Sequence, residues 1–143
     1  MRIRIKKLSE NAVLPKYGSE SAAGADLSAL AGAEIAPGET ALIRTGLALE
    51  IPEGYAGLIY ARSGLASKRG LAPANKVGVI DADYRGEILV ALHNHSSLPA
   101  SIAAGERIAQ LVVTPFLRVE FEESEELSDT ERGAGGFGST GKK

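Results

Sequence analysis

The sequence predicts an all-β protein, built as an antiparallel sandwich or barrel. Short β-like runs dominate the chain, and 17 glycines and 6 prolines punctuate them. Many short strands between turn signals are typical of barrels and double-sheet folds. One stretch alone favours a helix. A chain of 143 residues provides core for one domain, with roughly two-thirds of the unfolded surface buried.

The expected strands follow one another along most of the chain. They are Arg2 to Lys6, Thr40 to Ile51, Tyr55 to Ala61, Val77 to Ile80, Glu87 to Leu92, Ala100 to Ile102 and Arg107 to Leu117. "PGE" from Pro37 and "PEG" from Pro52 are turn signals between strands.

The helix is expected over "SGLASKRG", with Ser63 as the N-cap and Gly70 as the stop. After the last strand, "EFEESEELSDTE" from Glu120 to Glu131 is acidic and polar. Such a segment is typical of a solvated linker. We therefore expect a β domain over 1–119, an acidic linker over 120–131 and a glycine-rich tail over 132–143.

Composition excludes several classes of function. The net charge is -2 with 24% charged residues, so the chain has no polybasic face for nucleic acid. The absence of cysteine excludes disulfides and thiolate-zinc sites. The N-terminal stretch lacks the apolar core of a signal peptide, and no apolar run approaches the roughly 18 residues of a membrane span. A soluble, cytoplasmic protein is the expectation.

The C-terminal stretch "RGAGGFGSTGKK" resembles two nucleotide-binding motifs but completes neither. Gly133, Gly135 and Gly138 match G-x-G-x-x-G, but no residues remain for the helix which that motif opens. Gly136 to Lys142 matches G-x-x-x-x-G-K, but Lys143 follows where a P-loop needs Ser or Thr. Glycines still let backbone N–H groups approach an anion. An inert flexible terminus is the alternative.

The stretch "VGVIDADYRGEILV" favours two strands joined by a tight bend. A calcium loop is excluded, because Arg85 and Leu92 occupy its fifth and twelfth positions. A hairpin would place Asp81 roughly opposite Glu87 and Val79 opposite Leu89. The alternative is that the aspartates only serve the turn.

An anion site is one interpretation of the start of "ARSGLASKRG", and an ordinary arginine at a strand end with a capping serine is the alternative. Arg62, Ser63 and the backbone of Gly64 combine a guanidinium with a helix N-terminus. Asp26 lies among small residues, where a turn or strand-edge carboxylate is the alternative to a functional role. Gln110 is a polar side chain in an apolar strand and needs a partner if it is buried, which a structural hydrogen bond would provide.

Two further chemistries have weaker support. His93 and His95 point the same way from a strand, but two imidazoles without a third ligand make a poor zinc site. The chain has no G-x-S-x-G elbow and no cysteine nucleophile.

Five segments in order resemble the five motifs of the homotrimeric dUTP diphosphatase (dUTPase) family. They are "AGADLSA", "ARSGLASKRG", "NKVGVIDADYRGEI", "GERIAQLVV" and "RGAGGFGSTG", spread from Ala23 to Gly141. The one departure noticed is Ala61, where the family usually has proline. Since that position shapes the backbone, the departure does not put catalysis in doubt.

The resemblance implies a jelly-roll-like distorted β-barrel and a homotrimer with sites at the subunit interfaces. It also implies that the tail is an arm that reaches across the trimer and closes over a nucleotide. The substrate would be dUTP, cleaved to dUMP and pyrophosphate, which keeps uracil out of DNA and supplies dUMP for thymidylate synthesis. Neither nucleic acid nor membrane is an expected partner.

The resemblance also assigns roles to residues. Asp81 would be the general base that activates water for attack on the α-phosphorus. Mg²⁺ would be chelated by the phosphates, with Asp26 near it through water. The triphosphate would be held by Arg62, Ser63, Gly64 and Gln110, and the γ-phosphate by Arg132, Gly138, Ser139 and Thr140.

Recognition of the nucleoside is assigned to the bend and the tail. Phe137 would stack on uracil, and Tyr84 would pack on the deoxyribose and exclude a 2′-hydroxyl. Asn75, with backbone groups of Val79, Ile80, Asp81 and Leu89, would pair with the uracil edge, whereas cytosine would leave buried groups unpaired. Asp83 is expected to be structural. A dCTP deaminase-like or bifunctional enzyme, or a non-catalytic nucleotide-binding regulator, remains the alternative.

Overall fold

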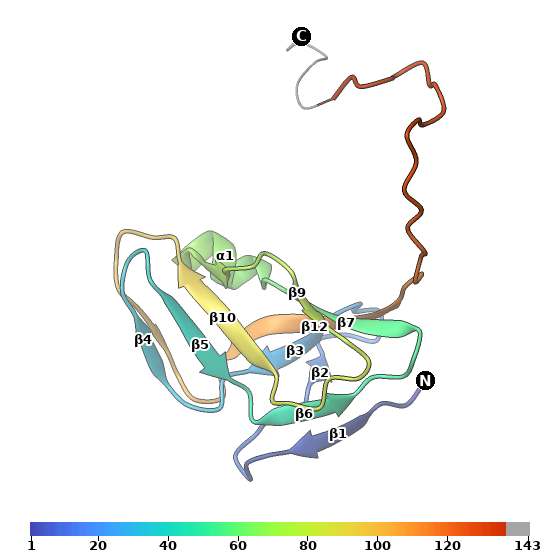
Figure 1. Ribbon diagram of the computed structural model, residues 1–143. Coiled ribbons are helices and arrows are strands. Elements are labelled where there is room, and N and C mark those ends of the chain that lie inside the picture. The colour runs from blue at the N-terminus through green and yellow to red at the C-terminus, as the bar shows by residue number, and fades with distance from the viewer. Residues whose placement is uncertain (137–143) are drawn as a thin grey trace.

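The computed structural model of the chain describes residues 1–136, and strands dominate it (Figure 1). In chain order the elements are β1 (Arg4–Lys7), β2 (Lys16–Tyr17), β3 (Ala25–Ser28), β4 (Ala33–Ile35), β5 (Thr40–Arg44), β6 (Leu47–Glu50), β7 (Tyr55–Tyr60), α1 (Ser63–Arg69), β8 (Leu71–Pro73), β9 (Gly78–Ile80), β10 (Leu89–Asn94), β11 (Ala100–Ile102) and β12 (Arg107–Pro115). The predicted all-β class with one short helix is confirmed.

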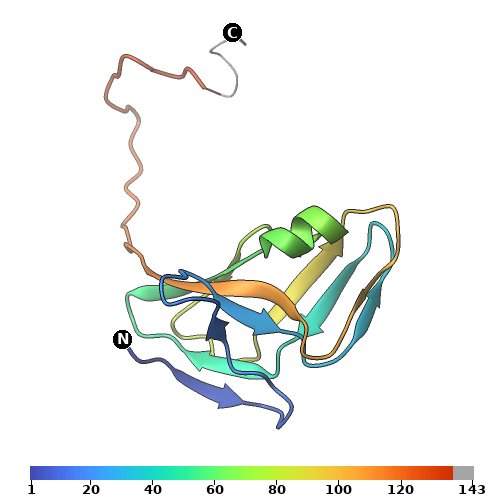
Figure 2. The same cartoon turned by 180° about the vertical axis from the view of Figure 1, so that it is seen from behind.

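Two larger sheets face each other across the core. The five-stranded sheet has the order β2-β3-β12-β7-β9, and the three-stranded sheet has the order β5-β10-β8. The five-stranded sheet lies behind the other in Figure 1 and in front of it in Figure 2. The pairs β1-β6 and β11-β4 complete the body. Over residues 1–136 these four groups do not join into one closed ladder, so the fold is a distorted β fold rather than a closed barrel.

The core fills the space between the sheets with aliphatic side chains. Leu27 and Ile108 from one sheet and Leu92 from the other are fully buried. Burial of such a side chain stabilises the fold by about 1.5–3 kcal/mol. Because successive side chains of a strand point to opposite faces, the apolar positions of each strand determine which face points into the core.

The predicted strand from Thr40 to Ile51 is two strands, because the chain turns a corner at Gly46. Gly46 has φ 70°, a left-handed conformation that suits glycine. A Cβ at this position would lie 2.9 Å from the Cβ of Ala12 and 3.1 Å from Leu30. At this corner the chain passes from β5, in the three-stranded sheet, to β6, which pairs with β1.

The predicted hairpin around Asp83 is wrong in its pairing. β9 pairs with β7, which places Val79 opposite Leu58. β10 pairs with β5 and β8, which places Leu89 opposite Arg44. The bend therefore connects strands of two different sheets instead of two strands that pair with each other.

Other boundaries also differ from the prediction. The strands β2, β3, β4 and β8 were not expected, since they are short and are held by long-range pairing rather than by local pattern. Arg62, not Ser63, occupies the N-cap position of α1, and it makes no side-chain capping bond. Gly70 ends the helix at φ 65° as predicted.

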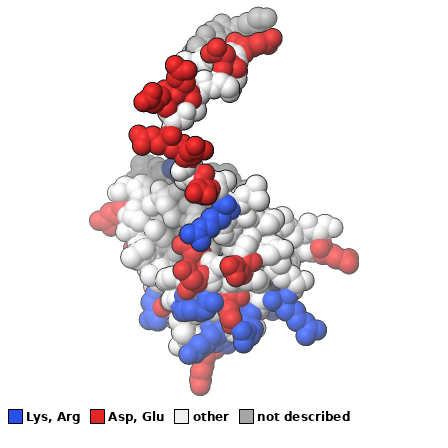
Figure 3. Space-filling view, turned by 45° about the vertical axis from the view of Figure 1, so that its right-hand side comes forward, with Lys and Arg blue, Asp and Glu red and all other residues white. Residues whose placement is uncertain are grey.

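The segment after β12 leaves the body. Phe116 donates its N–H to the carbonyl of Gly54 at 3.1 Å, and residues 117–135 are exposed. Figure 3 shows the carboxylates of this segment projecting away from the body. Within residues 1–136, no helix is long and apolar enough to cross a membrane.

Candidate active site

A hollow of about 550 Å³ collects five of the predicted site residues. They come from three elements and lie side by side in the lining: Asp26, Arg62, Ser63, Gly64 and Gln110. The pairing of β12 with both of its neighbours explains this. Gln110 lies opposite Asp26 on β3 and opposite Tyr60 on β7, so neighbouring side chains on one face meet.

Asp26 is held by two arginines. Its Oδ1 accepts a 2.7 Å bond from Nε of Arg62, and its Oδ2 accepts a 3.0 Å bond from Nη1 of Arg107. The side chain of Asp26 is 16% exposed, against 27% for Arg62 and 58% for Arg107. Charge-assisted bonds of this kind are directional. Asp26 therefore sets the orientation of Arg62 at the edge of the hollow.

The amide group of Gln110 is bonded at its nitrogen and lies close to Gly24 at its oxygen. Its Nε2 donates to the carbonyl of Ala61 at 2.9 Å, which is the structural bond that the sequence allowed. A Cβ at Gly24 would lie 2.4 Å from Oε1 of Gln110. The glycine is thus required for the close approach of the amide.

The hollow carries more positive than negative charge. Its lining includes Arg62, Lys68, Arg69 and Arg107, against Asp26 and Glu106. Arg69 is neutralised locally by an ion pair with Glu106. An excess of cationic groups in a concave site attracts anions. The hollow is suited to a phosphorylated ligand.

Asp81 lies elsewhere on this chain. It lines a second hollow of about 960 Å³, together with Asp83, Arg85 and Arg4. Asp81 is exposed, and its carbonyl accepts the N–H of Tyr84 at 3.2 Å. Tyr84 is 42% exposed, and its phenol donates to the carbonyl of Glu87 at 3.0 Å. The carboxylate and the phenol are presented outward on one bend.

The strand that leads to Asp81 is an edge strand. β9 is the last strand of its sheet, and Val79 is 60% exposed. Leu89, on the far side of the bend, is 40% exposed. Asn75 is exposed in the preceding turn, where Lys76 has φ 64°. An open strand edge offers N–H and C=O groups to a planar partner.

One chain does not gather all predicted site residues. Asp26, Arg62, Ser63, Gly64 and Gln110 line one hollow, while Asp81 lines another. Arg132 donates from Nε to the carbonyl of Gly135 at 2.7 Å, in a local turn of the projecting segment. The predicted Phe137, Gly138, Ser139 and Thr140 lie outside the described residues.

Two residues of the hollow escaped the sequence reasoning. Arg107 shares Asp26 with Arg62, and Gly24 makes room for Gln110. Arg107 could have been suspected as a cation that opens the strand of Gln110. The need for Gly24 depends on a cross-strand contact that spacing does not reveal.

The histidine pair has a structural partner. The His93 and His95 rings are 4.3 Å apart in an edge-on arrangement, and Nδ1 of His93 lies 2.9 Å from the hydroxyl of Thr40. Desolvation, with the electrostatic effect of the nearby His93 and Lys76, lowers the pKa of His95 below its usual value. Residues 1–136 contain no group of three or more His, Asp or Glu side chains that could hold a metal ion.

Comparison with known proteins identifies the family. Residues 10–141 match the family model of dUTPase. The chain belongs to the dUTPase family. A deoxyuridine 5'-triphosphate nucleotidohydrolase of Nautilia profundicola is 55% identical over 99% of this chain and 100% of its own length. The enzyme of the same name from a Hydrogenobaculum species is 51% identical over the full length of both chains.

Solved dUTPase structures share the fold. A Staphylococcus bacteriophage 80alpha dUTPase with dUpNHpp has a TM-score of 0.91 at 34% identity, over 98% of each chain. A mutant dUTPase of phage phi11 of S. aureus, described for the coordination of a structural Mg(II) ion, has a TM-score of 0.81 at 30% identity. It covers 88% of this chain and 98% of its own. The jelly-roll-like dUTPase fold expected from the motifs is confirmed.

Proposed function

We propose that this protein hydrolyses dUTP to dUMP and pyrophosphate. The observation that carries the proposal is the cationic hollow, in which Arg62, Ser63, Gly64 and Gln110 converge where the dUTPase motifs place phosphate binding. Relatives that are named deoxyuridine 5'-triphosphate nucleotidohydrolase match this chain over nearly its whole length. The enzyme would thereby remove dUTP before its use in DNA and supply dUMP for thymidylate synthesis.

The hollow binds the triphosphate chain in this proposal. Arg62 supplies a guanidinium whose direction is set by Asp26, and Ser63 and Gly64 supply donors at the start of α1. Gln110 retains donor and acceptor capacity beyond its bond to Ala61. The arginine's fork matches phosphate oxygens in geometry as well as charge.

Mg²⁺ fits the donors available. Both oxygens of Asp26 already accept bonds from arginines, so Asp26 would not coordinate the ion directly. Each oxygen can still accept a bond from a water of the ion's shell. Mg²⁺ characteristically keeps several waters and binds substrate phosphates with few carboxylates. When bound, it would orient the phosphates and offset their charge. Asp26 would serve that ion through water while it positions Arg62.

Asp81 acts as the general base. An exposed carboxylate on the bend can accept a proton from a water that attacks the α-phosphorus. Because Asp81 and Arg62 line different hollows of one chain, a complete site draws them from different subunits. A homotrimer with interfacial sites satisfies this requirement.

The bend and β9 select the base and the sugar. The open edge at Val79 and Ile80, with Asn75 and Leu89, pairs with the uracil edge. Tyr84 packs on the deoxyribose, and its bond to Glu87 limits the space for a 2′-hydroxyl. A site built for hydrogen bonding rejects a base that leaves its groups unpaired.

The tail closes the site in this proposal. Residues 1–119 form the catalytic domain, 120–131 an acidic linker, and 132–143 an arm that covers the bound nucleotide. Arg132, Gly138, Ser139 and Thr140 hold the γ-phosphate, and Phe137 stacks on uracil. The enzyme acts in the cytoplasm on a free nucleotide, with neither nucleic acid nor membrane as a partner.

A paired assay tests the proposed function. Purified protein with Mg²⁺ is given dUTP while pyrophosphate is measured, and dCTP while ammonia is measured. We expect pyrophosphate from dUTP and no ammonia from dCTP. Ammonia release would indicate a deaminase or a bifunctional enzyme. Nucleotide binding without either product would indicate a regulator.

A further inference from the structure

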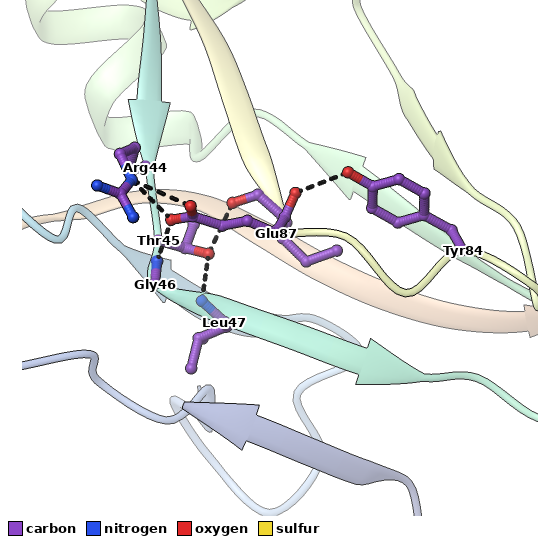
Figure 4. Close-up of polar contacts among 7 residues, drawn as sticks. Arg44, Thr45, Gly46, Leu47, Tyr84 and Glu87 are labelled. Atoms are coloured by element: carbon purple, nitrogen blue, oxygen red, sulfur yellow. Dashed lines mark hydrogen bonds and ion pairs between the residues drawn. The ribbon is translucent and has the colours of Figure 1, made fainter. Parts of the chain in front are cut away.

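An acidic side chain helps to anchor the bend over residues 81–86, which carries Asp81 and Tyr84. Glu87 lies between this bend and β10, and its side chain is only 16% exposed. Its Oε1 accepts the N–H of Gly46 at 2.7 Å. Its two carboxylate oxygens also accept from Nε of Arg44, at 3.0 and 3.2 Å. Figure 4 shows the carboxylate aimed into the corner between β5 and β6.

The corner that receives Glu87 is rigid. Thr45 is 1% exposed, and its hydroxyl donates to the carbonyl of Ile88 at 2.7 Å. The N–H of Ile88 donates to the carbonyl of Leu47 at 2.8 Å. Gly46 has φ 70°, and a Cβ at this position would lie 2.9 Å from the Cβ of Ala12. Glu87 therefore connects the bend to a part of the body that has little freedom to move.

Short contacts connect Glu87 to the residues proposed to act on substrate. The phenol of Tyr84 donates to the carbonyl of Glu87 at 3.0 Å, and the N–H of Tyr84 donates to the carbonyl of Asp81 at 3.2 Å. A Cβ at Gly86 would lie 2.4 Å from the Tyr84 hydroxyl. The ring thus lies against the backbone immediately before Glu87.

We propose that Glu87 is a positioning residue, which holds Asp81 and Tyr84 in register by bonding to Gly46 and Arg44. The inference rests on the proposed function and deepens it. β9 is an edge strand and does not pair with β10, so the bend lacks a hairpin ladder to hold it. The side-chain bonds of Glu87 to the corner, together with the bonds of the Ile88 backbone, take the place of that ladder. Displacement of a catalytic group by about 1 Å can cost about 10²-fold in rate.

The test compares Glu87→Ala, Glu87→Gln and Arg44→Ala with Glu34→Ala, a control that removes an exposed glutamate from β4. For each, kcat/KM is measured for dUTP and for UTP. We expect Glu87→Ala to lower kcat/KM for dUTP about tenfold or more, and the preference for dUTP over UTP about threefold. Glu87→Gln retains an acceptor for Gly46 and should stay within about threefold.

Sugar preference is the measurement that separates positioning from mere stability. A variant that only unfolds more readily loses active protein but retains the dUTP to UTP ratio of the folded remainder. The proposal would be overturned if Glu87→Ala had the wild-type kcat/KM for dUTP and the wild-type dUTP to UTP ratio. If Glu87→Ala does not fold, Arg44→Ala tests the proposal instead. The side chain of Arg44 is 60% exposed, so its removal should leave the fold intact. We expect it to lower the ratio about twofold, and an unchanged ratio would overturn the proposal.

Hydrogen exchange of the amides over 81–88 separates this inference from the proposed function. We expect exchange about tenfold faster in Glu87→Ala than in Glu34→Ala, because the bend opens more often. A wild-type protein that fails to cleave dUTP would refute the proposed function, and the exchange rates would still test the anchor. Equal exchange in the two variants would overturn the anchor whatever the activity.

Discussion

The body and the segment after β12 hold their functional residues in opposite ways. In the body, Arg62 is oriented by Asp26, and Gln110 by Ala61, through bonds that span 36 and 49 residues of sequence. In the segment, Arg132 bonds to Gly135, three residues away. The body is ordered by contacts distant in sequence, whereas the hydrogen bonds within residues 117–136 join only close neighbours along the chain.

The two regions obtain the free energy that orders them from different sources. Side chains in the body reach their positions when the core forms, before any ligand arrives. Gly133 to Lys143 contains five glycines in eleven residues, and such a chain is costly to order unaided. Under the proposed function, the nucleotide itself must organise the arm. The two regions should therefore fail differently when they are altered.

The largest effect is expected from Asp81→Asn, which alters the chemistry without altering shape. The amide cannot accept the proton of the attacking water, so kcat should fall about a thousandfold or more. Binding of dUTP, measured by calorimetry, should stay within about tenfold. Asp83→Asn changes the neighbouring carboxylate and should retain activity. More than a few per cent of wild-type turnover in Asp81→Asn would refute its role as base.

Deletion of Gly133 to Lys143 should give the next largest effect. Loss of a closing lid exposes the reaction to water, and kcat/KM should fall about a hundredfold. The melting temperature without ligand should change by less than about 2 °C, because the arm adds little core. Deletion of Lys142 and Lys143 alone is the control and should be harmless. Full-length rates in the longer deletion would mean that the tail is only a flexible end.

Mixing two defective proteins tests whether body and arm come from different subunits. Phe137→Ala should lower kcat/KM about tenfold or more, through lost stacking on the base. Mixed with Asp81→Asn under subunit exchange, it should regain activity, since a mixed trimer can draw its bend and its arm from unaltered chains. Light scattering should show trimers. Activity equal to the sum of the separate proteins would contradict shared sites.

A smaller effect is expected from Gly24→Ala, which disturbs the preformed hollow. The new Cβ would overlap Oε1 of Gln110, so the amide must move and kcat/KM should fall about tenfold. Gly18→Ala is the matched control, because a Cβ there meets nothing within 4 Å. Equal kinetics in the two variants would show that the position of Gln110 is unimportant.

The smallest effect concerns the stability of the body at acid pH. Desolvation and nearby positive charge lower the pKa of His95, so the unfolded chain binds a proton more readily than the folded one. Stability should therefore fall as pH drops below about 6.5, the ordinary value. The side chain of His95 is exposed, so the effect should be small. We expect His95→Gln to raise the melting temperature at pH 5.5 by about 1 °C more than it does at pH 7.5. If His95→Gln changed the melting temperature by the same amount at both pH values, His95 would be excluded as the cause of the acid destabilisation.

Local patterns in the sequence were sufficient for some elements and not for others. The strands from Tyr55, Ala100 and Arg107 were predicted, since each combines an apolar face with turn residues at its ends. The break at Gly46 and the pairing of Val79 with Leu58 were not predicted. Both depend on which distant strand offers the better apolar partner, and periodicity alone does not carry that information.

The all-β class, the five ordered motifs and hence the dUTPase family could be inferred without coordinates, because they depend on residue types and their order. The folded chain was needed to find that Asp26 faces Arg62 and Arg107, that Gly24 makes room for Gln110, and that Glu87 bonds to the corner at Gly46. Each of these contacts joins residues more than 35 positions apart. Their distances are set by sheet order and by the packing of the core, which no local stretch of sequence specifies.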